Sequence, residues 1–179
     1  MLTLPIGDGA ELRALEPWQA AEFAAFIEAA RPHLAPWLPW ATSITDEAGA
    51  REFLQRYAER QAAGEGRIYG IWLDGRLVGG TLFRTFDVAS GVCELGVWLA
   101  PSAQGRGLVT RAARHLIGWA LGVRGLNRVE WHCAVDNQRS IAVAQRLGMT
   151  REGVLRSAFS VDGARQDVEV WSLLAGDRR

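Results

Sequence analysis

A glycine-rich turn lies in the stretch Trp98–Leu116, WLAPSAQGRGLVTRAARHL, between a run that predicts a strand and a run that predicts a helix. The turn contains Gln104, Gly105, Arg106 and Gly107. Glycines let the backbone approach a ligand closely and turn its N–H groups inward, and the start of a helix adds partial positive charge. Such a loop is suited to hold an anion, and a pyrophosphate group is its natural occupant.

Four interpretations of this turn differ in the residues that they require. A P-loop requires a lysine, and the sequence has none, so that interpretation fails. A dinucleotide-binding fingerprint requires a third glycine where Thr110 stands, and its acidic partner, Glu130, falls within a strand rather than at a strand end. The pattern Q/R-x-x-G-x-(G/A) fits Gln104–Leu108, with Val109 in place of the last small residue. A plain strand–helix turn without a ligand stays open.

Glu94 is the carboxylate with the clearest setting for acid–base chemistry. It lies in the run CELGVW, where strict alternation gives two faces, Glu94, Gly96 and Trp98 on one and Cys93, Leu95 and Val97 on the other. A carboxylate inside an apolar strand is costly unless it has a partner. Glu94 is therefore either a general base or the partner of an arginine, and the sequence leaves both interpretations open.

Polar and aromatic residues elsewhere supply further candidates. His33 adjoins the tryptophan-rich segment LAPWLPW, and it either lines a pocket or lies at the surface. Trp37 and Trp40 form a plug over the core or one wall of a pocket, and the two roles are compatible. His132 alternates within a strand as either a packed residue or a substrate contact, whereas His115 belongs to the polar side of its helix.

Helices and strands of a mixed sheet must position these residues. Helical spacing predicts a helix over residues 18–30, the prolines of RPHLAPWLPW exclude a long regular element there, and TDEA predicts a helix that begins at Thr45. Asp74-Gly75 and Asp162-Gly163 predict two hairpins. The expected strands are residues 10–17, 67–73, 76–86, 91–99, 128–135, 152–161 and 164–174. The expected fold class is α+β, with six to seven strands and about four helices.

Composition excludes several classes of protein. The 179 residues, 49% of them hydrophobic, suit one compact domain spanning residues 1–179. A formal net charge of zero predicts no nucleic-acid or membrane partner. Cys93 and Cys133 lie in apolar runs, so they are expected to be reduced core residues of a cytoplasmic protein. The start of the chain lacks a signal-peptide pattern. Without a CxxC or HExxH pattern, no metal site is expected.

The glycine turn and the segment DNQRSIAVAQRLGMTREGVLR together resemble the GNAT superfamily of acyl-CoA-dependent N-acyltransferases, in its RimJ/RimL-like branch. The segment matches N-x-x-S-x-x-(V/A)-x-x-x-x-G-(F/M)-x-x-E-G-x-L-R at Asn137, Ser140, Gly148, Met149, Glu152, Gly153, Leu155 and Arg156. LAPWLPW resembles the tryptophan-rich segment between the first helices of this branch, and the terminal hairpin with Asp167 also fits. The resemblance covers nearly the whole chain.

The resemblance implies a GNAT fold that binds acetyl-CoA as co-substrate. Its sheet would splay between the fourth and fifth strands, residues 95–99 and 128–134, and the pantetheine arm would enter there. Main-chain groups of Val97, Trp98 and Leu99 would bond the arm, Asn137 would touch it, and Ser140 would face the sulfur as general acid. The pyrophosphate would be held by N–H groups of the turn, with Gln104 and Arg106 flanking it; the residues are Gly105, Arg106, Gly107, Leu108, Val109 and Thr110.

The resemblance further implies direct acetyl transfer to a primary amine, without metal or covalent enzyme intermediate. Presenting an α-amine, with a pKa near 7.7–8.0, in neutral form at pH 7 costs about 1 kcal/mol, whereas a lysine amine near 10.4 costs about 4.6 kcal/mol. A weak base such as Glu94 therefore suits an α-amine. The branch favours a protein N-terminus, as in a ribosomal protein, with His33, Trp37 and Trp40 at the acceptor site.

Other substrates and assemblies stay open at this stage. The acceptor is alternatively a small amine such as an antibiotic or a polyamine, and the donor is alternatively another acyl-CoA such as succinyl-CoA. A CoA-binding module without catalysis is the rival from another class. The exposed edge of the terminal hairpin and the eight tryptophans also suit a homodimer.

Overall fold

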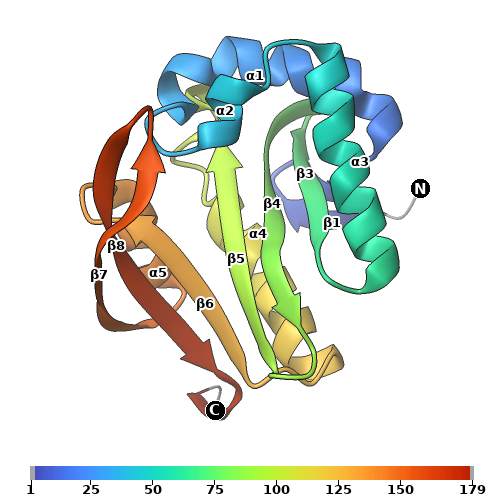
Figure 1. Cartoon of the computed structure of the whole chain (residues 1–179). Coiled ribbons are helices and arrows are strands. Elements are labelled where there is room, and N and C mark those ends of the chain that lie inside the picture. Colours follow the sequence, from blue (N-terminus) through green and yellow to red (C-terminus); the bar gives the residue numbers. More distant parts are fainter. Residues whose placement is uncertain (1–2, 178–179) are drawn as a thin grey trace.

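The computed structural model describes residues 3–177 and shows one mixed sheet with helices on both faces (Figure 1). The strands are β1 (Thr3–Gly7), β2 (Ala10–Ala14), β3 (Arg67–Leu73), β4 (Arg76–Asp87), β5 (Val92–Leu99), β6 (Arg128–Ala134), β7 (Thr150–Val161) and β8 (Ala164–Leu174). The α-helices are α1 (Ala20–Leu34), α2 (Pro39–Ser43), α3 (Glu47–Ala63), α4 (Leu108–Gly118) and α5 (Gln138–Arg146). A π-helical turn, Trp119–Val123, continues α4.

The strand order in the sheet is β1-β2-β3-β4-β5-β6-β8-β7. All neighbouring strands are antiparallel except β5 and β6, which are parallel. The expected α+β class is confirmed. Over residues 3–177 the sheet has eight strands, slightly more than the six to seven expected, and five α-helices are present rather than about four.

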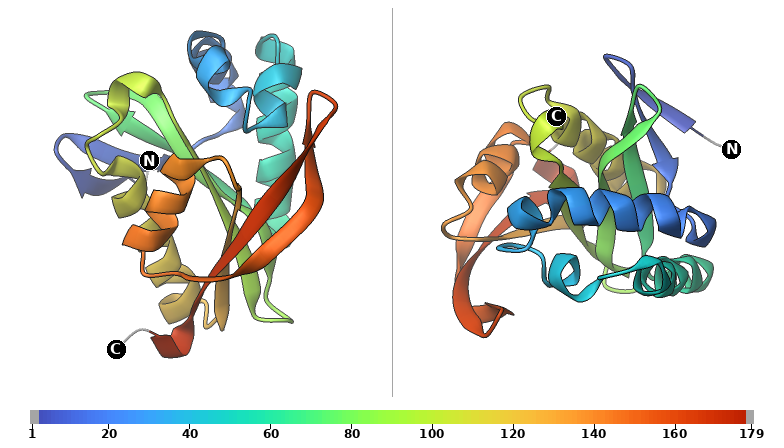
Figure 2. Two further views of the ribbon diagram at one scale, coloured as in Figure 1. Left: turned by 90° about the vertical axis from the view of Figure 1, so that its left-hand side faces the viewer. Right: turned by 90° about the horizontal axis from the view of Figure 1, so that it is seen from above.

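Two apolar layers hold the helices against the sheet. One layer joins α1, α2 and α3 to residues such as Trp72, Leu82 and Trp98 of the sheet. The other joins α4 and α5 to the opposite face, through residues such as Leu95 and Trp131. Figure 2 shows α1 and α3 side by side over the first face. The alternation expected in CELGVW is therefore observed, because Leu95 and Trp98 pack into opposite layers.

Asp-Gly dipeptides form three of the hairpin turns. Asp74 and Gly75 have φ values of 49° and 77°, and Asp162 and Gly163 have 47° and 79°, so both turns have the left-handed residues of a type I′ hairpin. The third turn, Asp8-Gly9, joins β1 to β2, and neither this turn nor β1 was predicted from the sequence. Strand β1, with its proline, is the edge strand where proline is tolerated.

Two expected helix boundaries were wrong. The helix α3 is capped by Asp46 rather than by Thr45, because the Asp46 carboxylate accepts a hydrogen bond from the N–H of Gly49 over 2.8 Å. The helix α1 continues through Pro32 to Leu34 instead of ending near residue 30. A proline in the last turn of a helix removes only one backbone hydrogen bond, so the apolar contacts of this turn can offset its cost.

The sheet separates between β5 and β6, as expected for the fourth and fifth strands when β1 is not counted. Pairing joins only Val92 to Arg128, Cys93 to Val129 and Glu94 to Glu130. Beyond Glu94 the two strands diverge, and Figure 1 shows them meeting near their starts and moving apart toward α2. The divergence opens one edge of β5 at the centre of the sheet.

Charged hydrogen bonds join the first residue of β6, Arg128, to Glu152 of β7. Both carboxylate oxygens of Glu152 accept from the guanidinium of Arg128, and Ser172 Oγ donates to Glu152 over 2.7 Å. The hydrogen bonds from Arg128, followed by that from Ser172, lower the pKa of Glu152 to about 2. The carboxylate therefore stays charged far below neutral pH.

Over residues 3–177, no helix is both long and apolar enough to cross a membrane.

Candidate active site

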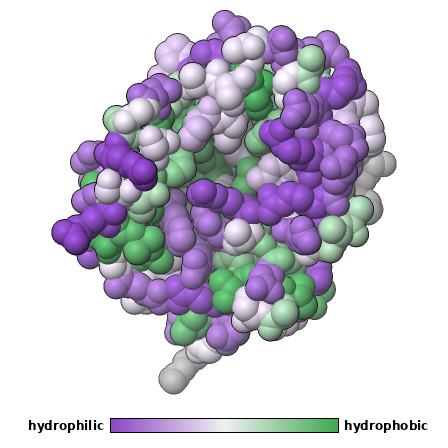
Figure 3. Space-filling model, viewed as in Figure 1, coloured by the Kyte–Doolittle hydropathy of each residue, from purple (hydrophilic) through white to green (hydrophobic). Residues whose placement is uncertain are grey.

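A single cleft of about 1210 Å³ runs through the divergence between β5 and β6. Figure 3 shows the molecule hollowed in this region. Apart from Arg106, which is exposed, all residues proposed from the sequence for catalysis, cofactor binding or acceptor binding line this cleft. A cavity of this size exceeds the usual range for one small ligand, about 300–1,000 Å³, so it has room for two substrates.

The glycine turn presents backbone N–H groups without competition from side chains. Gly105 and Gly107 have φ values of 78° and 68°, in the left-handed region that favours glycine. Gly107 is the N-cap of α4, and no side chain caps this helix. The space beside Gly105 is open, because a Cβ built there would meet no atom within 4 Å. An uncapped helix start at an open turn fits the pyrophosphate of coenzyme A.

The main chain of β5 offers hydrogen-bonding groups to the gap. Thr81 Oγ1 on β4 donates to the carbonyl of Gly96 over 2.9 Å, and the N–H of Ala100 donates to Val78 over 2.8 Å. Because successive residues of a strand alternate in direction, the main-chain groups of Val97 and Leu99 point toward the gap. Those of Trp98 turn toward β4, so the alternation does not favour its predicted main-chain contact with the cofactor.

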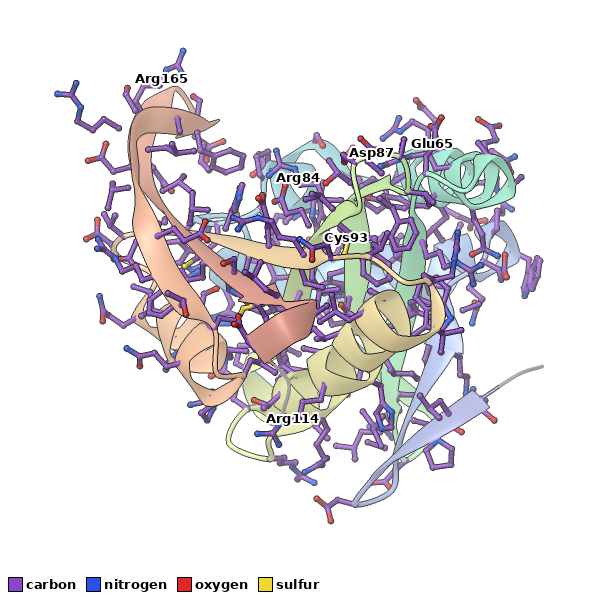
Figure 4. All side chains as sticks on the ribbon, turned by 90° about the horizontal axis from the view of Figure 1, so that it is seen from below. Glu65, Arg84, Asp87, Cys93, Arg114 and Arg165 are labelled. Atoms are coloured by element: carbon purple, nitrogen blue, oxygen red, sulfur yellow. The ribbon has the colours of Figure 1, made fainter. Side chains whose placement is uncertain are left out.

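Glu94 lies at the point where the strands diverge, with its side chain only 13% exposed. Its Oε1 is 3.4 Å from Arg84 Nη1 and 3.8 Å from His132 Nδ1. An arginine partner, one of the two alternatives for Glu94, is thus present, and the Arg84 side chain is 56% exposed, so solvent screens this pair. Figure 4 labels Arg84 on β4 and Arg165 at the outer end of the β7–β8 hairpin.

Ser140 is held in a defined position at the start of α5. Its N–H donates to Asn137 Oδ1 over 3.1 Å, so Asn137 caps the helix as its residue type suggested. The indole N–H of Trp131 donates to Ser140 Oγ over 2.9 Å. A hydroxyl that accepts one hydrogen bond is a better donor of its own proton. Ser140 can therefore donate into the cleft.

Aromatic residues form the other end of the cleft. Trp40 meets Trp98 edge-on, with ring centroids 5.4 Å apart, and Trp37 also lines the cleft. His33 is joined to the glycine turn, because Gln104 Nε2 lies 2.8 Å from His33 Nε2. Burial, with a smaller contribution from Arg139, lowers the pKa of His33, so the neutral ring can accept this hydrogen bond. The Gln104 amide thus connects the two ends.

The two cysteines are unsuited to act as nucleophiles. Burial raises the pKa of Cys133 to about 11 and that of Cys93 to about 12. Both thiols are therefore protonated at neutral pH, and a protonated thiol is a poor nucleophile. Within the described part of the chain, no group of three or more His, Cys, Asp or Glu side chains could hold a metal ion.

Several residues of the cleft were not predicted from the sequence. Tyr57 and Phe53 reach it from α3, Trp131 supports Ser140, and Phe159 stacks under Arg84 at 5.7 Å. Phe53 and Tyr57 are buried residues of α3, and helical spacing alone does not show that they face a cleft. The contacts of Trp131 and Phe159 join separate elements, and no local pattern reports them.

Comparisons with known proteins agree with this geometry. A family model described as an acetyltransferase (GNAT) domain matches residues 13–150. YdaF of Bacillus subtilis (strain 168), provisionally named a ribosomal N-acetyltransferase, is 33% identical over 97% of this chain and 96% of its own. The ribosomal-protein-serine acetyltransferase of Escherichia coli (strain K12) is 26% identical over 95% of each chain.

A solved structure shows the same fold with acetyl-CoA bound. The microcin C7 self-immunity acetyltransferase MccE, in complex with acetyl-CoA and AMP, superposes with a TM-score of 0.88. It is 26% identical, and the match covers 94% of each chain.

Proposed function

We propose that this chain acetylates the N-terminal α-amine of a protein, in particular a ribosomal protein. The chain belongs to the RimJ/RimL-like branch of the GNAT acetyltransferases and is an acyl-CoA-dependent N-acetyltransferase. The observation that carries the proposal is the single cleft joining the uncapped glycine turn to Glu94 and the aromatic segment. The two curated relatives named above support the acceptor class. A ribosomal acceptor also implies a cytoplasmic location, and residues 1–179 would form one catalytic domain.

Binding of acetyl-CoA is assigned to the residues on one side of the cleft. The N–H groups of Gly105 to Thr110 hold the pyrophosphate, and the exposed Arg106 adds charge from outside. Val97 supplies a main-chain N–H near the thioester, where it can stabilise negative charge on the carbonyl oxygen. Leu99 and Asn137 contact the pantetheine arm.

Acid–base roles are assigned to two residues on either side of the thioester. Glu94 takes a proton from the attacking amine, which enters from the end lined by His33, Trp37 and Trp40. Ser140 donates a proton to the departing thiolate and recovers one from the second proton that the ammonium acceptor loses. The N–C bond forms as the C–S bond breaks, so each turnover of an ammonium acceptor yields an amide, a thiol and one free proton.

Replacing Ser140 by alanine is expected to lower kcat while the affinity for acetyl-CoA is unchanged. The thiolate is a good leaving group because a thiol has a pKa near 8.5, so the expected loss is only about tenfold. Stopped-flow release of thiol and calorimetry with acetyl-CoA measure the two quantities. Thr45→Ala, a change on the exposed surface, is the control. Unchanged turnover in Ser140→Ala would remove this residue from the mechanism.

The acceptor class is tested by thiol release from acetyl-CoA with three panels of amines. We expect turnover with peptides that carry a free α-amine, and none when the same peptides are N-terminally blocked but contain lysine. Turnover only with polyamines or aminoglycosides would reassign the acceptor to a small molecule. Binding of acetyl-CoA without turnover on any panel would indicate a binding module, and replacing it by succinyl-CoA tests the donor.

We also propose that two copies of the chain pair through β7. This strand is the last in the sheet order, and its Val154 is 38% exposed. An unpaired edge strand with exposed apolar residues favours association with another strand. Sedimentation equilibrium is expected to give twice the mass of the chain, and Val154→Arg is expected to shift it to the monomer. A monomeric wild-type protein would refute the pairing.

A further inference from the structure

A line of polar side chains leads away from Glu94 along β6. His132 and Glu130 share the face of β6 on which Arg128 lies, since they alternate along the strand. His132 Nε2 is 3.0 Å from Glu130 Oε2, and Arg128 Nε donates to the other oxygen, Glu130 Oε1, over 2.7 Å. Each oxygen of Glu130 thus has its own partner, and this fixes the orientation of the carboxylate.

The partner of Nε2 determines the form of the His132 ring. A carboxylate only accepts hydrogen bonds, so Nε2 must carry the proton that it donates to Glu130. In the neutral ring the other nitrogen, Nδ1, is then without a proton. That nitrogen is the one facing Glu94, at 3.8 Å from Oε1. A histidine oriented by a carboxylate, with its free nitrogen toward the reacting groups, is arranged to accept a proton.

The distance from Nδ1 to Glu94 is too long for a direct hydrogen bond, but it leaves a gap that a water molecule can bridge. His132 also borders the cleft, and its side chain is 23% exposed. On the other side of Glu94, Arg84 cannot accept a proton, because its guanidinium is already protonated and stays charged. Of Arg84 and His132, only His132 can take up a proton.

We propose that His132 relays the proton released in each turnover from Glu94 to solvent, a role that rests on the proposed acetyltransferase function. An ammonium acceptor loses two protons, of which one compensates the departing thiolate and one must leave the site. Glu94 accepts the leaving proton and passes it to Nδ1 of His132, and the resulting imidazolium is stabilised by Glu130. The imidazolium returns its proton to water at the exposed edge of the ring, which resets both groups.

The test compares His132→Ala with His115→Ala, a matched histidine that is exposed on α4. Thiol release is measured at saturating acetyl-CoA and peptide amine, with and without added imidazole. For His132→Ala we expect kcat to fall about 100-fold. Added imidazole should raise the kcat of this variant about tenfold, because a free imidazole can replace the missing proton acceptor. The affinity for acetyl-CoA should not change, and His115→Ala should behave as wild type.

His132→Gln and Glu130→Gln complete the series. Glutamine keeps a polar side chain at position 132 but cannot relay a proton, so its kcat should fall as in His132→Ala and should not respond to imidazole. Glu130→Gln should lower kcat by about tenfold, since it removes the charge that stabilises the imidazolium. A wild-type kcat in either folded His132 variant, or a loss that imidazole does not reverse in His132→Ala, would overturn the relay. No turnover by wild-type protein would instead refute the proposed function.

Discussion

Replacing Glu94 by glutamine is expected to lower kcat by about 100- to 10,000-fold, the contribution typical of general acid–base catalysis. Glutamine keeps the size and a hydrogen-bonding oxygen, but it cannot accept a proton. The affinity for acetyl-CoA should be unchanged, because the pyrophosphate and pantetheine contacts assigned above lie on other residues. Steady-state thiol release and calorimetry measure these two quantities separately.

Two control variants separate catalysis from ion pairing. Glu28→Gln breaks a pair with Arg31, at 2.7 Å, on the surface of α1, and it should leave kcat unchanged. Arg84→Met removes the arginine beside Glu94 itself. If Glu94 served only to pair with Arg84, Arg84→Met and Glu94→Gln would have equal effects on kcat. We expect Arg84→Met to change kcat by only a few fold. Equal losses of kcat in Arg84→Met and Glu94→Gln would contradict the role of Glu94 as general base.

Local sequence patterns predicted most of the fold. Asp-Gly dipeptides located two hairpins, and alternation in CELGVW assigned Leu95 and Trp98 to opposite apolar layers. Where the prediction failed, two local signals competed. Asp46 and Thr45 are both good helix caps, and only the position of the first turn decides between them. Strand β1 was not predicted, although Asp8-Gly9 is a hairpin signal of the same kind as the two that were used.

The candidate site was less predictable because its contacts cross between elements. The position of Glu94 in its strand followed from alternation, whereas its distance from His132 depends on how β5 and β6 pair before they diverge. Similarly, a cap at Asn137 is a local feature, but the indole of Trp131 reaches Ser140 only because α5 packs on β6. Interactions of this kind depend on tertiary structure, which single-residue patterns do not encode.

The divergence of β5 and β6 explains why the cofactor and the proton path share one place. Continuous pairing would bury the edge of β5 and leave no main-chain groups for a ligand. Because pairing stops at Glu94, the next residues of β5 expose their N–H and C=O groups, and Glu94, the last paired residue, lies beside His132 of β6. The end of the shared ladder therefore sets both the binding edge and the location of the acid–base groups.

Replacing Gly105 by alanine is expected to weaken binding of coenzyme A, and Gly148→Ala provides a matched comparison. The two glycines have φ values of 78° and 76°, and a Cβ at either position would meet no atom within 4 Å. Each substitution should therefore cost a similar free energy of folding, about 1–2 kcal/mol for a left-handed residue. Because the backbone strain is the same in the two variants, a difference in affinity for coenzyme A reports the contact between Gly105 and the ligand.

Only Gly105 lies in the cleft, where its N–H is assigned to the pyrophosphate. A methyl group there would occupy the open space beside the turn, which the anion must enter to reach that N–H. Losing one hydrogen bond to a charged group costs about 1.5–3 kcal/mol, so coenzyme A should bind roughly 10- to 150-fold more weakly. Calorimetry should show this loss for Gly105→Ala and wild-type affinity for Gly148→Ala. Equal affinities in the two variants would mean that the turn does not hold the pyrophosphate, and the assignment of the cofactor to this cleft would then fail.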